Sequence, residues 1–148
     1  MMRARREVRV EARIEAPPLE VWRWISHHEG MPRWMPVREV VRRRAGAPEP
    51  DGVGAIRTVK AGGLAFDEEI VDAKPGERLE YRLIGGAPLR EHRGVVRLSA
   101  DGEGTLLVWT VGFRPWIPGT GFLVEREVRR LLEGGVRGLA RLAAGVAR

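Results

Sequence analysis

Residues 55–71, AIRTVKAGGLAFDEEIV, predict two short antiparallel strands joined by a Gly62-Gly63 turn. A two-residue turn fixes the register of a hairpin, because residues at equal distances from the turn become directly opposed. Arg57 then faces Glu68 across the hairpin. The two side chains form either an ion pair on the surface or the polar floor of a pocket, and the neighbouring strands decide between these possibilities.

Further turns extend this hairpin into a meander of antiparallel strands between residues 53 and 114. Tight turns are predicted at 74–77 (KPGE), 85–88 (GGAP) and 101–104 (DGEG). Counting from the second of these turns places Tyr81 opposite His92, and counting from the third places His92 opposite Phe113. The sequence therefore predicts that these three side chains lie beside one another across the sheet.

The predicted pairing also decides which side chains point inward. Side chains alternate across a strand, and directly opposed residues share a face. One face is mainly apolar and is expected to form the core; it carries Val53, Ala55, Arg57, Val59, Phe66, Glu68, Ile70, Leu79, Tyr81, Leu83, His92, Gly94, Val96, Leu98, Leu107, Trp109, Val111 and Phe113. Because Arg57 and Glu68 belong to this face, we expect their pair to lie inside the protein.

Outside the meander, the sequence predicts two more strands, two short helices and one long helix. Strands are expected at 7–16 and 37–45, short helices at 17–29 and 31–36, and a long helix at about 119–146. Pro17 and Pro18 suit the start of the first helix. The long helix carries an apolar stripe, which predicts that one side of it packs against the sheet.

Three glycines, Gly134, Gly135 and Gly138, interrupt the apolar stripe of the long helix. Each costs up to about 1 kcal/mol of helix stability relative to alanine. Either they let the helix pack closely against the sheet, or they leave space beneath the helix for a ligand. The pattern itself leaves both interpretations open.

Several of these segments resemble one known family. They are IEAPPLEVWRWI at 14–25, WMP at 34–36, EEIVDAKPGERLEYRL at 68–83, GTLLVW at 104–109 and GLARLA at 138–143. With them, the chain resembles the START-like (SRPBCC) superfamily, which has the helix-grip fold of the birch-pollen allergen, and within it the polyketide cyclase/dehydrase and lipid-transport proteins. The resemblance implies a single α+β domain over residues 1–148, with a seven-stranded curved antiparallel sheet wrapped around a long C-terminal helix and two short helices after the first strand.

The resemblance also implies a long cavity between the sheet and the last helix. In hormone receptors of this fold, the turns after the third and fifth strands act as gate and latch, and here they correspond to 61–64 and 85–88. Strand alternation places both turns at one end of the sheet, together with the loop 115–119. We therefore expect a mouth at this end, with Trp116 and Phe122 near its rim.

Eight residues are candidates for contact with a ligand: Arg57, Glu68, Tyr81, His92, Trp109, Phe113, Trp116 and Phe122. A buried Arg57 must be paired, and Glu68 is its natural partner. The pair either closes on itself and fixes the strand register, or leaves a guanidinium donor for a ligand oxygen. Tyr81 and His92 form either a hydrogen-bonded core pair or a pair that transfers a proton.

Two functions fit these candidates. The first is binding, with transport or sequestration, of a small hydrophobic or amphipathic molecule in the cavity, without chemistry. The alternative is a polyketide aromatase/cyclase or dehydratase, in which Arg57, Tyr81 and His92 anchor the substrate and move protons. Neither function calls for a cofactor, and the sequence leaves a homodimer open.

Composition argues against other classes of function. The net charge of +6 comes almost entirely from arginines interleaved with glutamates, which is typical of a solvated basic face rather than a nucleic-acid site. The chain has no cysteine, and the side chains of the adjacent His27 and His28 are expected to point apart, so no metal site is predicted. No apolar run is long enough to enter a membrane, and a cytoplasmic location is expected.

Overall fold

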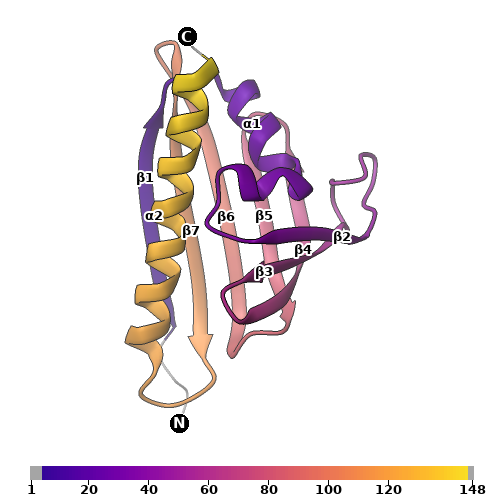
Figure 1. Ribbon diagram of the computed structural model, residues 1–148, viewed down its shortest axis with the longest axis vertical. Helices are drawn as coiled ribbons and strands as arrows, with labels where there is room; N and C mark the ends of the chain where they lie inside the picture. Colours follow the sequence, from indigo (N-terminus) through magenta and orange to yellow (C-terminus); the bar gives the residue numbers. More distant parts are fainter. Residues whose placement is uncertain (1–4, 147–148) are drawn as a thin grey trace.

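The computed structural model describes residues 5–146 of the 148, and over these residues the chain folds into one curved sheet, two α-helices and one 3-10 helix (Figure 1). The elements are β1 (Arg6–Ile14), α1 (Pro18–Ser26), η1 (His28–Arg33), β2 (Glu39–Arg44), β3 (Ile56–Ala61), β4 (Leu64–Lys74), β5 (Arg78–Gly85), β6 (Leu89–Asp101), β7 (Gly104–Pro115) and α2 (Gly121–Val146). Neither described α-helix is both long enough and apolar enough to cross a membrane.

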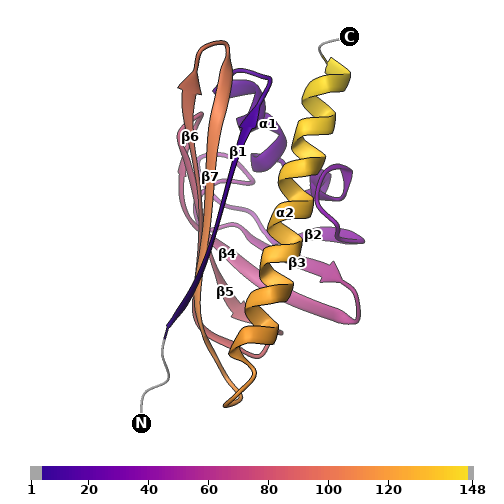
Figure 2. The same cartoon turned by 90° about the vertical axis from the view of Figure 1, so that its left-hand side faces the viewer.

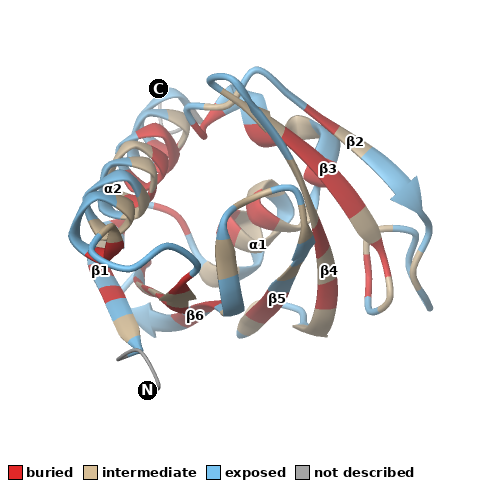
Figure 3. Cartoon of the chain, turned by 90° about the horizontal axis from the view of Figure 1, so that it is seen from below, coloured by how far each residue is buried: buried red, intermediate tan, exposed pale blue. Residues whose placement is uncertain are grey.

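All neighbouring strands are antiparallel, and the order across the sheet is β1-β7-β6-β5-β4-β3-β2. The first strand closes the meander by pairing with the last, with Val10 opposite Trp109. The sheet curves around α2, whose long axis runs along its concave side (Figure 2). Seen from below, buried positions lie on the inner sides of the sheet and of α2 (Figure 3). The predicted α+β helix-grip architecture is confirmed.

The register of the first hairpin follows the prediction. Gly62 adopts a φ of +57°, and the turn places Arg57 opposite Glu68. Across the next turn, Ile70 lies opposite Tyr81, also as the counting predicts. The polar pair is therefore carried inward by β3 and β4, with 3% of Arg57 and 5% of Glu68 exposed.

The predicted register between β5 and β6 is wrong by two residues, because Tyr81 lies opposite Gly94 rather than His92. Residue-by-residue pairing of these strands ends at Tyr81, so the connection around 85–88 is wider than a tight turn. The predicted pairing of His92 with Phe113 is wrong for a related reason, since β6 is irregular between Arg90 and Arg93. A shift of two residues keeps a side chain on the same face, so His92 still points inward.

One residue assigned to the core face lies outside it. Val53 is 43% exposed, because it belongs to the loop before β3 and forms an isolated bridge with Ala47. Strand alternation does not extend that far. The other inward assignments hold: Ala55, Val59, Ile70, Leu79, Val96, Leu98, Leu107, Trp109, Val111 and Phe113 are buried.

The three helix glycines serve close packing. A Cβ on Gly138 would lie 1.9 Å from the backbone oxygen of Trp34, and one on Gly135 would lie 2.7 Å from the sulfur of Met35. Real Cβ atoms do not approach other atoms so closely, so only glycine lets α2 reach the segment that follows η1. The interpretation of the glycines as packing residues is confirmed, and the cavity described below lies elsewhere along α2.

Candidate functional site

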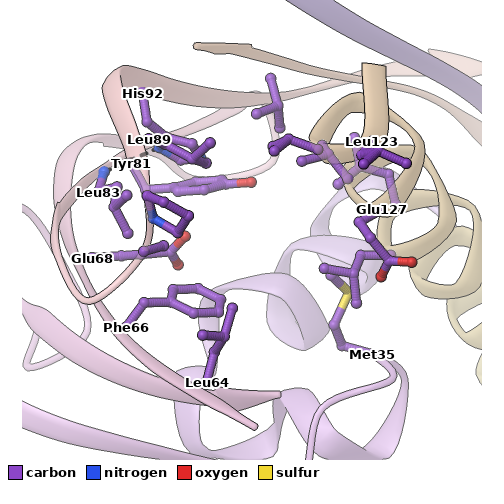
Figure 4. A pocket seen from close by; sticks show the side chains of 17 residues that line it. Met35, Leu64, Phe66, Glu68, Tyr81, Leu83, Leu89, His92, Leu123 and Glu127 are labelled. Carbon is purple, nitrogen blue, oxygen red and sulfur yellow. Dashed lines mark hydrogen bonds between the residues drawn. The ribbon is translucent and has the colours of Figure 1, made fainter. Parts of the chain in front are cut away.

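A cavity of about 330 Å³ lies between the first half of α2 and the inner face of the sheet (Figure 4). Its lining is almost entirely apolar and comes from β4, β5, β6, β7, α2, the loop between β5 and β6, and Met35 after η1. The lining residues are Met35, Leu64, Phe66, Glu68, Tyr81, Leu83, Ala87, Pro88, Leu89, His92, Val111, Leu123, Val124, Glu127, Val128, Leu131 and Leu132. Its volume falls at the lower end of the range for small-molecule sites.

The loops expected at the mouth do gather at one end of the molecule, the lower end in Figure 1. Two of them contribute to the cavity, through Leu64 in one case and Ala87 and Pro88 in the other. Trp116 and Phe122 do not line it; they are 50% and 59% exposed on its outer side. The guanidinium of Arg90 lies 5.6 Å from the centre of the Trp116 ring, which holds this indole against β6.

The floor of the cavity contains the Arg57–Glu68 ion pair. Nε of Arg57 donates to Oε1 of Glu68 at 3.0 Å, and Nη2 lies 2.9 Å from the same carboxylate oxygen as part of the ion pair. Glu68 lines the cavity, whereas Arg57 lies one layer behind it. The arrangement is the reverse of a site in which the arginine faces the ligand, because here the carboxylate stands between the cavity and the guanidinium.

His28, at the start of η1, supplies the third partner of this cluster. Its ring is fully buried, and its Nδ1 lies 3.0 Å from Nη1 of Arg57. Its Nε2 lies 2.9 Å from the backbone oxygen of Asp51, which can only accept, so the proton sits on Nε2 and Nδ1 accepts from Arg57. Burial, followed by the positive charge of Arg57, lowers the pKa of His28 from 6.5 to about 3.

Tyr81 lies between the ion pair and the core. The guanidinium of Arg57 is 5.0 Å from the centre of the Tyr81 ring, and Trp109 Nε1 donates to the Tyr81 hydroxyl at 2.9 Å. A Cβ on Gly94 would come within 2.1 Å of the ring, so glycine makes room for it. Burial raises the pKa of Tyr81, and the nearby Glu68 carboxylate adds to the effect. The phenol is therefore held neutral.

His92 lies beside Tyr81 but is engaged elsewhere. The two ring centres are 5.7 Å apart, while His92 Nδ1 accepts the backbone N–H of Leu83 at 3.0 Å. Burial lowers the pKa of His92. Within the described residues no hydrogen bond joins Tyr81 to His92, so the two neighbours do not form a hydrogen-bonded pair.

The eight candidates thus fall into three positions. Glu68, Tyr81 and His92 line the cavity; Arg57, Trp109 and Phe113 are buried behind its wall; and Trp116 and Phe122 lie on the outer rim. Sequence reasoning missed His28, since nothing in the HHEG segment distinguishes a buried imidazole from an exposed one. It recognised Val124, Val128 and Leu131 only as an apolar stripe, although these residues form one wall of the cavity.

The described residues contain no group of three or more histidine, aspartate and glutamate side chains that could hold a metal ion. Arg57 is bound to Glu68 and His28, Tyr81 accepts from Trp109, and His92 accepts from the backbone of Leu83. The site is therefore an apolar cavity with a few hydrogen-bonded polar side chains at its floor.

Residues 5–144 match a protein family described as polyketide cyclase / dehydrase and lipid transport. The chain belongs to this family. The match spans every strand and all but the end of α2, so it covers the whole cavity. No curated protein matches the sequence.

Solved structures with the same fold include proteins from several bacteria. A START superfamily protein from Mycobacterium smegmatis superposes with a TM-score of 0.82 at 14% identity, over 95% of this chain and 98% of that one. A protein from Thermus thermophilus gives 0.78 at 23% identity, over 97% and 100%. A protein from Thermobifida fusca gives 0.75 at 26% identity, over 90% of each chain. These similarities establish the START-like fold.

Proposed function

We propose that the protein binds a small, predominantly apolar molecule in the cavity between α2 and the sheet, as a carrier or a sequestering protein. The observation that supports this most directly is the cavity of about 330 Å³ with its apolar wall. Protein interiors are normally packed without voids of this size. A space lined by aliphatic and aromatic side chains, with few polar groups, is typical of a site for a small organic molecule.

The geometry favours binding over the cyclase or dehydratase alternative. Proton transfer needs a donor and an acceptor that can reach the substrate with pKa values near the working pH. Here Arg57 is held behind Glu68, and the Nδ1 of His92 is occupied by a backbone amide. The pKa of Tyr81 is raised by burial, away from neutral pH. These three groups support the wall and floor of a binding site better than a reaction.

Fluorescence titration with 1-aminoanthracene, a small neutral dye that brightens in apolar surroundings, tests the proposal. Val128 lines the cavity, so Val128→Trp should fill it and weaken dye binding at least about tenfold, which corresponds to about 1.4 kcal/mol. Ala140, on the exposed side of the same helix, gives the matched control Ala140→Trp, which should bind the dye normally. Equal binding by both variants, or none by the native chain, would overturn the proposal.

Mass spectrometry of small molecules retained by the purified native protein complements this titration. We expect a retained compound to be released on unfolding and to be depleted in preparations of Val128→Trp. A compound retained equally by that variant would lie outside the cavity.

A further inference from the structure

The carboxylate of Glu68 uses only one of its two oxygens within the protein. Oε1 accepts a hydrogen bond from Nε of Arg57 and lies 2.9 Å from its Nη2, whereas Oε2 has no hydrogen-bond partner among the described residues. Oε2 is also not sealed inside the protein, because the one fully buried, unpartnered side-chain nitrogen or oxygen among those residues is Nε of Arg78. Since Glu68 lines the cavity, Oε2 opens into it.

Figure 4 shows how this carboxylate is presented: it points into the cavity between Phe66 and Tyr81. Its surroundings are apolar on most sides, and Glu68 as a whole is only 5% exposed. A charged oxygen with unused lone pairs is costly in such a place unless a donor reaches it. Oε2 therefore offers a charged acceptor to a hydrogen-bond donor on a molecule in the cavity.

The charges of the floor decide what kind of donor fits. The Arg57 guanidinium already balances the Glu68 carboxylate, and His28 is neutral with its lone pair turned toward Arg57. A ligand carboxylate would meet the like charge of Glu68 before it could reach Arg57. A ligand ammonium would bring an additional charge into a floor that is already balanced, and it would lose its hydration in an apolar cavity. A neutral donor avoids both costs.

Tyr81 adds a second polar group at the same floor. Its hydroxyl accepts from Trp109, and its own hydrogen has no acceptor among the described residues. Its oxygen points into the space that the Glu68 carboxylate also faces (Figure 4). A ligand hydroxyl can donate to one group and accept from the other, so its two hydrogen-bonding capacities match the floor.

We infer that the cavity selects neutral apolar molecules bearing a single hydroxyl group, which donates its hydrogen to Oε2 of Glu68. The inference rests on the proposed function and adds the class of ligand to it. The other carboxylate in the wall, Glu127, is bound to Arg130 and lies 60% exposed, so it faces water and does not offer a second site of this kind.

Displacement of 1-aminoanthracene by four matched probes tests the inference on the native chain. The probes are 4-propylphenol, its methyl ether 4-propylanisole, 4-propylbenzoate and 4-propylbenzylamine. Loss of a hydrogen bond to a charged acceptor should make the ether bind about tenfold or more weakly than the phenol. The two charged probes should also bind more weakly than the phenol.

The variant Glu68→Gln tests whether Oε2 of Glu68 is the acceptor for the ligand hydroxyl. With the amide oxygen still accepting from Arg57, the amide nitrogen replaces Oε2 as a donor, so the phenol-to-ether preference should fall about tenfold. The charge of Arg57 is no longer balanced, so binding of 4-propylbenzoate should strengthen. The matched control Glu103→Gln, in the exposed turn between β6 and β7 and outside the cavity lining, should keep the native preference. If Glu68→Gln does not fold, the affinities of the four probes for the native chain still test the preference for a neutral hydroxyl ligand.

The outcomes separate the inference from the proposed function. If the dye binds but the phenol and the ether displace it equally, or the benzoate displaces it best, or the phenol does not displace it, the inference fails while the proposed function stands. If neither the dye nor any probe binds, both fail. An unchanged probe preference in a folded Glu68→Gln variant would also overturn the inference.

Discussion

The two halves of α2 meet the rest of the protein in different ways. The second half brings Gly135 and Gly138 against Trp34 and Met35, with Cβ positions too close for any larger residue. The first half presents Val124, Val128 and Leu131 to an open cavity. One continuous helix therefore closes the protein interior at one end and leaves it open at the other.

The difference shows how residue size and the layer beneath the helix together create a site. Where residues 34–36 pack against α2, Gly135 and Gly138 let the two backbones approach closely. Toward the other end of α2, Val124, Val128 and Leu131 pack partly against the core and partly line the cavity. The polar cluster of Arg57, Glu68 and His28 lies at the floor of the open half, where His28 of η1 is bound to Arg57.

Removal of Arg57 should have the largest effect on this arrangement. Arg57→Ala leaves the buried Glu68 carboxylate without its partner, so the free energy of unfolding should fall by about 3–5 kcal/mol. Urea denaturation measures the change. The double variant Arg57→Met with Glu68→Leu removes both charges and should be less destabilised than Arg57→Ala. A loss below about 1 kcal/mol for Arg57→Ala would mean that the pair is not desolvated.

The second largest effect is expected from acidification, which should lower the free energy of unfolding through protonation of His28. The folded-state pKa of His28, about 3, lies below its ordinary value of 6.5, so at intermediate pH the unfolded chain binds the proton and the folded chain does not. This contribution to stability is therefore complete above pH 6.5 and is lost as the pH falls toward 3. At about pH 4 the loss should approach about 3 kcal/mol.

Urea denaturation at a series of pH values isolates this effect. His28→Gln should show a shallower fall in the free energy of unfolding over the same range, whatever its stability at neutral pH. The same exchange at the exposed neighbour His27 is the matched control and should keep the native slope. Equal slopes for the native chain and His28→Gln would contradict the assignment.

Adding one methyl group at Gly138 should disrupt the close packing in the second half of α2. Gly138→Ala places a Cβ against the Trp34 backbone, so it should destabilise the protein by about 1–3 kcal/mol despite alanine's higher helix propensity. Gly145 has nothing within 4 Å of its Cβ position, so Gly145→Ala should be neutral or slightly stabilising. Thermal denaturation of both variants checks the contrast, and equal melting temperatures would refute close packing at Gly138.

The smallest effect is expected on the outer side of the open half. Glu127→Gln breaks an exposed ion pair with Arg130, three residues further along α2, and such pairs contribute about 0.5 kcal/mol or less. Its urea midpoint should therefore match that of the native chain. A loss comparable to that of Arg57→Ala would show that the cavity wall depends on this pair.

The hairpin around residues 55–71 could be predicted because its Gly-Gly turn is short and regular. A two-residue turn leaves one register, and alternation then sends Arg57 and Glu68 inward together. The Tyr81–His92 register could not be predicted, since the wider connection at 85–88 and the irregularity in β6 add residues that counting does not see. The inward direction of His92 survived because the shift was an even number of residues.

The finer geometry of the site depends on contacts between segments distant in the chain. Nothing near Arg57 in sequence indicates that His28 occupies its Nη1, or that Glu68 rather than Arg57 would face the cavity. The periodicity of a single strand or helix does not show how side chains from three separate segments pack together. Local patterns could therefore place Arg57 and Glu68 inside the protein, but they could not show which of the two faces the cavity.

Calorimetric titration of 1-aminoanthracene into the native chain and into Val128→Trp tests the central claim most directly. If the space under the first half of α2 is a binding site, the native chain should bind one molecule and the filled variant should bind at least about tenfold more weakly. Binding of equal strength by the two proteins, or no binding by the native chain, would contradict the account.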